Sequence, residues 1–227
     1  MDKQIVKRIK IKANNIYYPI RKFNKFVVVP LAWFALYALV QLLCYSTNIF
    51  VFFIGIFITW FMLAYEIEHP RVKMIKFENH KWPYKLNLCL LGLMILGLAI
   101  IYSFNNHNLT PSTNQQAVTQ LIQKNPLMII VVVCGAPVFE ENIFRRCLIS
   151  FNTKIQLIVS TIISCFIFAL AHLWGSPISQ PLYFLEYSLL GLGLASSYVL
   201  TRNIKYSIML HMTYNFIACL PMILMMN

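Results

Sequence analysis

Residues 127–150 read LMIIVVVCGAPVFEENIFRRCLIS, an apolar run into which four charged side chains are set. These charges are Glu140, Glu141, Arg145 and Arg146. A charged side chain at the centre of a lipid bilayer costs about 2.5–3.5 kcal/mol on insertion scales. Four such side chains within seven residues therefore need partners, water or a function.

The composition of the chain indicates that this segment lies inside a membrane. Of its 227 residues, 59% are hydrophobic and only 11% are charged, whereas about a quarter are charged in a typical soluble domain. The chain has only seven acidic residues, so the pair at 140–141 holds two of them. We therefore predict an integral membrane protein and not a soluble globular domain.

Apolar runs near the ~20 residues that cross a bilayer predict an all-α, polytopic transmembrane helical bundle of about seven to eight helices. The expected spans are 26–45, 49–65, 86–104, one that opens at Pro126, 155–174, 182–200 and 206–226. An eighth span would arise if a long one were broken. The chain then divides into a basic cytoplasmic segment at 1–25, N-terminal transmembrane helices and loops at 26–125, and a C-terminal part at 126–227.

The distribution of basic residues predicts the orientation, since short cytoplasmic loops collect lysine and arginine. With the N-terminus in the cytoplasm and seven alternating spans, Arg145 and Arg146 lie at a cytoplasmic helix end and only Lys124 falls outside. The net charge of +12 then reflects topology and attraction to anionic membrane lipid, with nucleic-acid binding as the weaker reading. Richness in lysine, asparagine and isoleucine indicates an AT-rich bacterial genome. We therefore expect the membrane to be a bacterial plasma membrane.

Helix geometry separates the two glutamates. Glu141 and Arg145 are four residues apart and share one face, which permits an internal ion pair. Glu140 points about 100° away and is the freer carboxylate. The competing interpretation is that Arg145 and Arg146 only end the span at the membrane surface, with the glutamates solvated beside them.

Polar side chains on two later spans suggest a common site. His172 ends the run CFIFALAH, and His211 and Asn215 are four residues apart in SIMLHMTYNFIACL. A carboxylate beside an imidazole can take a proton from water, while a second imidazole and an amide can hydrogen-bond the oxygen that becomes negative during attack on a carbonyl. This set predicts peptide hydrolysis by activated water.

A zinc site stays open on the residue types alone. One carboxylate and two histidines match the ligand set of catalytic zinc, and the ligands would be Glu140, His172 and His211. The HExxH spacing of helical zinc proteases is absent.

Three motifs in this part of the chain resemble those of a known family. EENIFR at 140–145 fits EExxxR, FALAH at 168–172 fits FxxxH, and HMTYN at 211–215 fits HxxxN. In this order, each on its own helix, they resemble the CPBP family of intramembrane endopeptidases, the CAAX proteases and bacteriocin-processing enzymes also called the Abi family. The resemblance covers about residues 126–220 and makes 126–227 the expected CPBP catalytic core.

The resemblance also implies roles for single residues and a polar cavity within an eight-span bundle. Glu140 and His172 would activate the water, and His211 and Asn215 would form the oxyanion site. The supporting motif residues would be Glu141, Arg145 and Phe168. Glu186 belongs to no motif; it lines the cavity or lies near the outer surface beside Tyr183 and Tyr187, and we favour a structural role.

Several functional alternatives remain open at this stage. The expected substrate is a peptide or protein, either in bacterial peptide processing or bacteriocin self-immunity, or in cleavage of prenylated CAAX proteins as the resemblance implies. A non-catalytic membrane scaffold or immunity protein is the main alternative, and an ion transporter is a weaker one.

The predicted topology makes one geometric demand. At 1.5 Å per residue, His172 rises about 26 Å from the cytoplasmic end of its span, whereas Glu140 lies about 10–15 Å deep. Straight helices would keep these side chains apart. We therefore expect a helix break near Gly135, Ala136 and Pro137, or a site nearer the middle of the membrane.

Overall fold

The computed structural model describes residues 28–44, 46, 48–68, 81–104, 111–173 and 181–224, with side chains omitted at 66–68. Within these ranges the chain is helical and contains no strand. The predicted basic segment at 1–25 lies outside the described residues. The structure confirms the predicted fold class, a helical membrane bundle.

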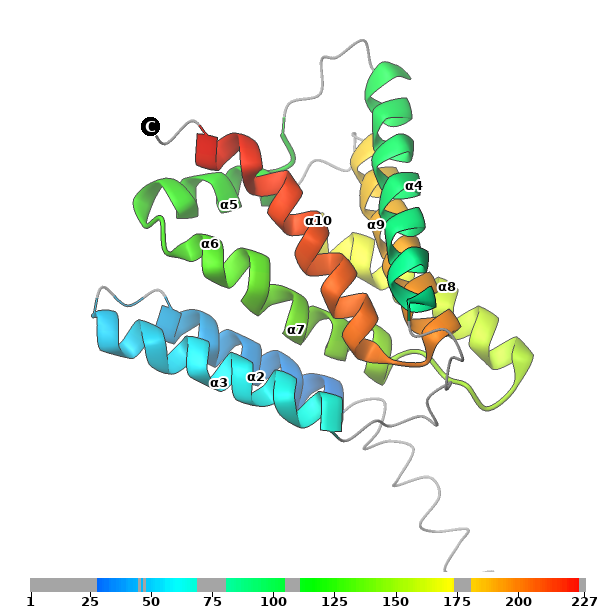
Figure 1. Cartoon of the computed structure of the whole chain (residues 1–227), viewed down its shortest axis with the longest axis horizontal. Coiled ribbons are helices and arrows are strands. Elements are labelled where there is room, and N and C mark those ends of the chain that lie inside the picture. The colour runs from blue at the N-terminus through cyan, green and yellow to red at the C-terminus, as the bar shows by residue number, and fades with distance from the viewer. Residues whose placement is uncertain are drawn as a thin grey trace, which may run out of the picture.

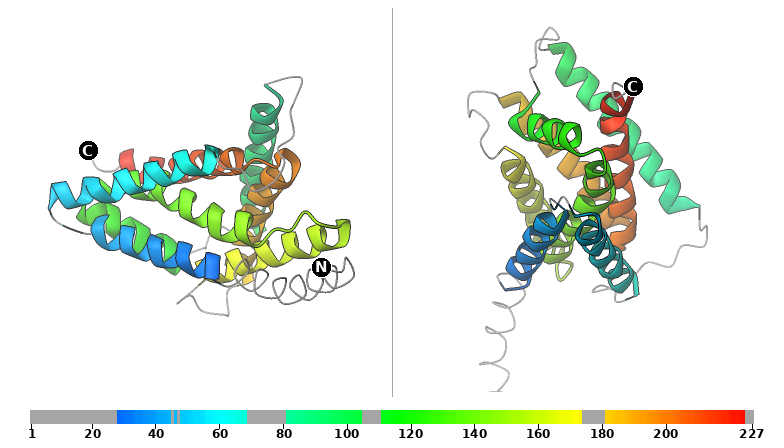
Figure 2. Two further views of the ribbon diagram at one scale, coloured as in Figure 1. Left: turned by 90° about the horizontal axis from the view of Figure 1, so that it is seen from below. Right: turned by 90° about the vertical axis from the view of Figure 1, so that its left-hand side faces the viewer.

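Two N-terminal helices form a hairpin along one side of the bundle (Figures 1 and 2). They are α2 (Val29–Cys44) and α3 (Ile49–Glu68). The ring of Trp33 meets Phe139 edge-on at 6.0 Å, and Tyr37 stacks on the same ring at 5.2 Å. These contacts seat the hairpin against the segment that carries Glu140 and Glu141.

Four other helices are long and apolar enough to cross a membrane. They are α4 (Trp82–Phe104), α8 (Lys154–His172), α9 (Pro181–Thr201) and α10 (Ile204–Leu224). Helix α9 packs against the other three and is the most buried of the four. Apolar side chains such as Leu88, Ile155 and Phe166 are exposed on the outer faces, as expected for contact with lipid.

A buried polar bridge joins three of these helices. Asn87 on α4 donates from Nδ2 to the carbonyl of Tyr206 at 2.7 Å, and its Oδ1 accepts from Ser197 Oγ on α9, also at 2.7 Å. In an apolar interior, paired polar groups of this kind hold helices in one register.

Each predicted apolar span corresponds to a helical stretch, but the additional helix is not a broken span. It is α5 (Thr113–Lys124), a short and largely polar helix whose first turn is capped by Ser112 Oγ accepting from the Gln115 amide at 3.2 Å. Its start lies in a stretch that the apolar pattern leaves as a loop, because α5 is too polar and too short to appear as a span.

The fourth predicted span is one helical path with two widened stretches in place of a break. It consists of α6 (Met128–Ile130), the π-helical turn η2 (Val131–Gly135), α7 (Ala136–Glu141) and the π-helical turn η3 (Asn142–Cys147). The helix does not break near Gly135, Ala136 and Pro137 as expected; it widens into a π-helical turn there. The backbone accommodates Pro137 by widening, which is a common distortion of helices at functional sites.

The competing interpretation, in which Arg145 and Arg146 only end the span with the glutamates solvated beside them, is wrong. Their exposed fractions are 0% and 5%, so both guanidinium groups lie inside the bundle. The chain continues to residue 153 before α8 begins, and α8 then runs antiparallel to the segment 128–147. Ser150 N donates to Ser160 Oγ at 2.9 Å, and Ser164 Oγ donates to the carbonyl of Phe144 at 2.6 Å.

This pairing removes the depth difference between Glu140 and His172. Since 150 faces 160 and 144 faces 164, residue 140 faces the end of α8. The error came from measuring the depth of Glu140 from the arginines, which do not mark the end of the hairpin.

We predict that Asn87→Leu lowers the free energy of unfolding in detergent by about 1–3 kcal/mol, because it leaves the Ser197 hydroxyl and the Tyr206 carbonyl without their partner. Leu88→Ala is the control on the same helix, since Leu88 is 70% exposed. An equal loss in both variants, followed by denaturant titration, would contradict a specific role for the polar bridge.

Candidate active site

The two glutamates end α7, between the two widened turns. Because Pro137 has no backbone N–H, a carbonyl in the preceding turn loses its helical donor. In a π-helical pattern that carbonyl belongs to Val132, and it accepts instead from Asn215 Nδ2 on α10 at 3.0 Å. The irregular backbone that precedes the first motif is thereby tied to the last residue of the third.

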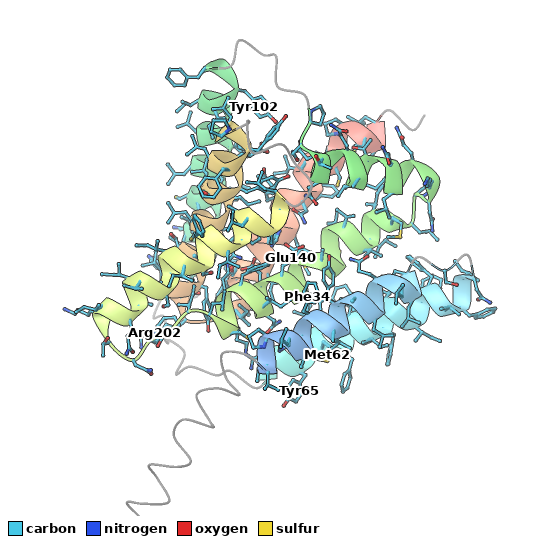
Figure 3. The ribbon with its side chains drawn as sticks, turned by 180° about the vertical axis from the view of Figure 1, so that it is seen from behind. Phe34, Met62, Tyr65, Tyr102, Glu140 and Arg202 are labelled. Atoms are coloured by element: carbon cyan, nitrogen blue, oxygen red, sulfur yellow. The ribbon has the colours of Figure 1, made fainter. Side chains whose placement is uncertain are left out.

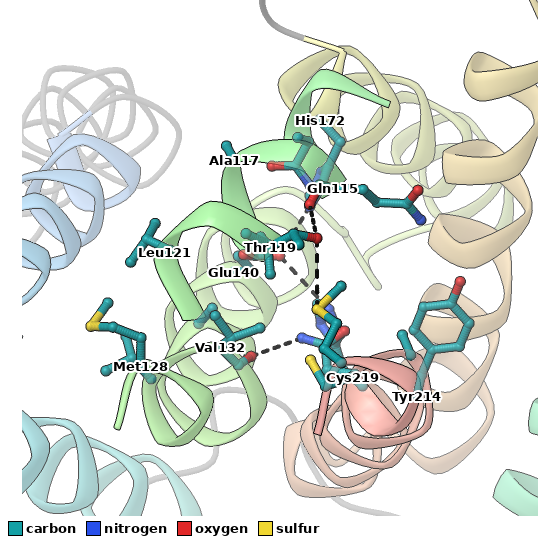
Figure 4. A pocket seen from close by; sticks show the side chains of 18 of the residues that line it. Gln115, Ala117, Thr119, Leu121, Met128, Val132, Glu140, His172, Tyr214 and Cys219 are labelled. Atoms are coloured by element: carbon teal, nitrogen blue, oxygen red, sulfur yellow. Dashed lines mark hydrogen bonds and ion pairs between the residues drawn. The ribbon is translucent and has the colours of Figure 1, made fainter. Parts of the chain in front are cut away.

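Glu140 is the point at which two histidines from other helices converge (Figure 4). Its Oε2 lies 3.5 Å from His172 Nε2 on α8 and 3.8 Å from His211 Nε2 on α10. Both distances exceed those of strong hydrogen bonds, and Oε2 is buried without a hydrogen-bond partner. The structure thus brings together the three residues that the sequence singled out.

The other nitrogen of each imidazole is held by a fixed partner. His172 Nδ1 lies 2.8 Å from the carbonyl of Phe168, and His211 Nδ1 lies 2.9 Å from Glu141 Oε1. A carbonyl or an ionised carboxylate can only accept, so we assign a proton to each Nδ1. Both Nε2 atoms are then directed to Glu140, as acceptors in neutral histidine and as donors only in the doubly protonated form.

Glu141 is completely buried and joins its own helical segment to α10. It pairs with Arg145 Nε at 3.3 Å, accepts from Ser207 Oγ at 2.5 Å and contacts His211 Nδ1. The predicted Glu141–Arg145 pair is therefore confirmed. Ser207 was missed, although it stands four residues before His211 and its place on the same helical face was visible in the sequence.

Phe168, the first residue of the second motif, packs between His172 and Arg145. Its ring is fully buried, and the ring centroid lies 4.2 Å from that of the His172 imidazole. Arg145 Cζ lies over the same ring, 4.3 Å from its centroid. A cation over an aromatic face is attracted by the ring quadrupole. Arg145 also donates from Nη2 to the carbonyl of Gly191 at 3.3 Å.

The candidate catalytic side chains line one cavity of about 690 Å³. Glu140, His172, His211 and Asn215 all line it, together with apolar side chains and the polar helix α5. The Ser112 and Tyr187 hydroxyls are 2.7 Å apart, which ties the start of α5 to α9. Figure 3 shows Glu140 within the bundle, above the hairpin that carries the labelled residues Phe34, Met62 and Tyr65.

Two further residues of the cavity were missed from the sequence, and the position of a third, Glu186, was left open. Gln115 lies on the unforeseen helix α5. Tyr187 packs its ring 4.9 Å from the His172 imidazole, and no motif marks it. Glu186, expected to be structural, is buried and lines the same cavity.

The donor set was also tested for a metal site. Among the described residues, no group of three histidine, cysteine, aspartate or glutamate side chains is arranged to hold a metal ion.

We predict that Arg145→Met lowers the free energy of unfolding by about 3–5 kcal/mol, because it leaves the Glu141 carboxylate buried without its cation. The matched control is the double variant Glu141→Gln, Arg145→Met, which removes the stranded charge and is expected to be the more stable of the two. Both are compared by denaturant titration in detergent. If the double variant is as unstable as the single one, the buried ion pair is not the source of the loss.

Comparison with protein families gives a match to the part of the chain that carries the three motifs. Residues 122–217 match the model of the type II CAAX prenyl endopeptidase Rce1-like family. All three motifs lie within this range. No solved structure gives a significant match to the chain.

Three curated bacterial proteins are similar to parts of the chain. The membrane-embedded CAAX protease MroQ of Staphylococcus aureus strain USA300 is 26% identical over 69% of this chain and 66% of its own length. YdiL of Bacillus subtilis strain 168, named as a candidate membrane peptidase, is 32% identical over 46% of this chain and 41% of its own. The UPF0177 protein in the abiGi 5′ region of Lactococcus lactis subsp. cremoris is 32% identical over 61% and 59%.

The chain thus spans less than two thirds of the length of each of these relatives. The matched family model begins just before the segment that carries Glu140 and ends just after Asn215. Together with the order of the motifs, this makes residues 122–217 similar to the Rce1-like family of type II CAAX prenyl endopeptidases.

Proposed function

We propose that the chain is an intramembrane endopeptidase that hydrolyses peptide bonds with water activated by Glu140 and His172. The observation that carries the proposal is the convergence of two histidines on one buried glutamate oxygen, at 3.5 and 3.8 Å, inside a cavity of about 690 Å³. The match of residues 122–217 to the Rce1-like family supports an intramembrane protease in general terms.

In the proposed reaction, the Glu140 carboxylate takes a proton from a water molecule as the water oxygen attacks the peptide carbonyl. The carbonyl π bond breaks and its electron pair moves onto the oxygen. The proton held by Glu140 then passes to the amide nitrogen as the C–N bond breaks, and this regenerates the carboxylate. His172, fixed by the Phe168 carbonyl, orients the water and the carboxylate.

The negative oxygen of the intermediate would be stabilised by His211 and Asn215. Asn215 uses one amide proton on the Val132 carbonyl, which leaves its second N–H for the substrate. His211 can donate from Nε2 only when doubly protonated, because its Nδ1 proton is committed to Glu141. Glu141 then acts as the counter-ion of His211, and Arg145 and Phe168 hold that pair in place.

We place the protein in a bacterial plasma membrane as a multi-pass protein with its N-terminus in the cytoplasm. Basic residues near the start of α8 and the turn between α9 and α10 support one common cytoplasmic end, since Arg202 Cζ lies 5.4 Å from the Phe151 ring. At the same end Tyr84 meets Tyr206 at 5.5 Å. The proposed role is bacterial peptide processing or self-immunity, with CAAX-type cleavage as the alternative.

We predict that Glu140→Gln or His172→Ala lowers kcat for a quenched fluorescent peptide by about 10²–10⁴-fold, since each removes part of the proton-transfer pair. The purified protein in lipid is assayed with CAAX-type and leader-type peptides, with and without a chelator. Thr213→Ala is the control, because its exposed hydroxyl bonds only within α10, to the Met209 carbonyl.

Cleavage that survives in Glu140→Gln would contradict the assignment of the base. Loss of cleavage on chelation would restore a metal mechanism. If no peptide is cut, and wild type and Glu140→Gln protect cells equally in an immunity assay, the non-catalytic scaffold replaces the protease.

We predict that Asn215→Ala lowers kcat by about 10²–10³-fold with little change in KM, because an oxyanion donor acts mainly in the transition state. The thermal unfolding midpoint is measured beside the kinetics, since Asn215 also bonds the Val132 carbonyl. A rise in KM with unchanged kcat would assign Asn215 to substrate binding and not to the oxyanion site.

A further inference from the structure

Glu186 is a buried acid that the proposed mechanism does not use. It lies on α9 with an exposed fraction of 3% and lines the same cavity as Glu140. Its one hydrogen bond within the described residues comes from Gln115 Nε2 on α5 at 3.3 Å, and no described cation forms an ion pair with it. A buried carboxylate supported only by an amide is costly.

Glu186 lines the same cavity as the reacting groups. The next residue, Tyr187, packs its ring 4.9 Å from the His172 imidazole, whose Nε2 is 3.5 Å from Glu140. A peptide bound along this cavity, which advances about 3.3–3.6 Å per residue when extended, would therefore contact both carboxylates.

The charge of the cavity indicates what Glu186 would bind. The described residues that line the cavity include the two carboxylates of Glu140 and Glu186 but no lysine or arginine. Glu140 has two imidazoles within 3.8 Å, whereas Glu186 has the amide of Gln115 alone. A positive group brought by the substrate would supply the missing partner, and the amide oxygen of Gln115 would be a second acceptor for it.

We propose that Glu186 and Gln115 form a subsite for a cationic group of the substrate peptide, a lysine or arginine side chain or a free amino terminus, close to the cleaved bond. The remaining lining is largely apolar, with residues such as Val131, Leu190 and Met222. The preferred substrate is therefore an apolar peptide that carries one positive charge. This inference rests on the proposed function and names the substrate class of that site.

The test compares matched peptides that differ only in that charge. A library of apolar peptides carries lysine or norleucine at single positions on either side of the cleaved bond, each with a free or an acetylated amino terminus. For the wild type in lipid nanodiscs we expect kcat/KM to be at least about tenfold higher with the positive charge, equivalent to about 1.4 kcal/mol. The difference is expected in KM.

Glu186→Gln is expected to bring this ratio close to one, whereas Glu186→Asp, which keeps a carboxylate, retains part of the preference. The acetylated peptides show whether the side chain or the amino terminus supplies the charge. An equal loss for lysine and norleucine peptides in Glu186→Gln, or an unchanged ratio, would overturn the subsite and leave Glu186 a structural residue.

Binding separates this inference from the proposed chemistry. Fluorescence anisotropy of the same labelled peptides is measured on Glu140→Gln and on the double variant Glu140→Gln, Glu186→Gln. A lysine preference in the first protein that is lost in the second supports the subsite even if the wild type cuts nothing. Equal binding of lysine and norleucine peptides to Glu140→Gln contradicts it, whatever the outcome of the cleavage assay.

Discussion

The organisation of the site depends on the burial of one carboxylate, Glu141. In a low-dielectric interior this group is tolerated only with full compensation, and Arg145, Ser207 and His211 supply it. The same contacts bring the segment of the first motif to α10 and orient the imidazole of the third. Arg145 in turn lies over Phe168 of the second motif. Stabilising Glu141 therefore assembles the three motifs around its neighbour Glu140.

The apolar runs and the motif spacings were enough to predict the helices and to select Glu140, His172, His211 and Asn215 as candidates. Their spacing along the chain could not show how they meet. That depends on the hairpin of 128–147 with α8, where Ser150 and Phe144 pair with Ser160 and Ser164. Arg145 and Arg146 misled the depth estimate for Glu140, because a basic pair after an apolar run has the same pattern whether it faces water or a buried partner.

Other features were hidden for different physical reasons. Helix α5 is specified by a cap at Ser112 and by contacts with α9, neither of which leaves a hydrophobic period. Tyr187 acts through ring packing that depends on the tertiary arrangement. The widened turns beside α7 follow in part from Pro137, but a proline alone does not tell whether a helix kinks, breaks or widens. Glu186 could not be placed from its sequence position, and the structure shows that it is buried and lines the cavity.

The central claim is that one glutamate carboxyl, that of Glu140, faces two imidazole nitrogens inside the membrane. Solid-state NMR on the protein in lipid, with ¹⁵N-labelled histidine and ¹³C-labelled glutamate, measures this contact directly. The account predicts a correlation between a single carboxyl carbon and the Nε2 atoms of both His172 and His211, and its loss in Glu140→Gln. The correlation of His211 Nδ1 with Glu141 is expected in both proteins. Nε2 atoms that correlate with no carboxyl carbon, or an Nε2 correlation that persists in Glu140→Gln, would contradict the convergence of these residues.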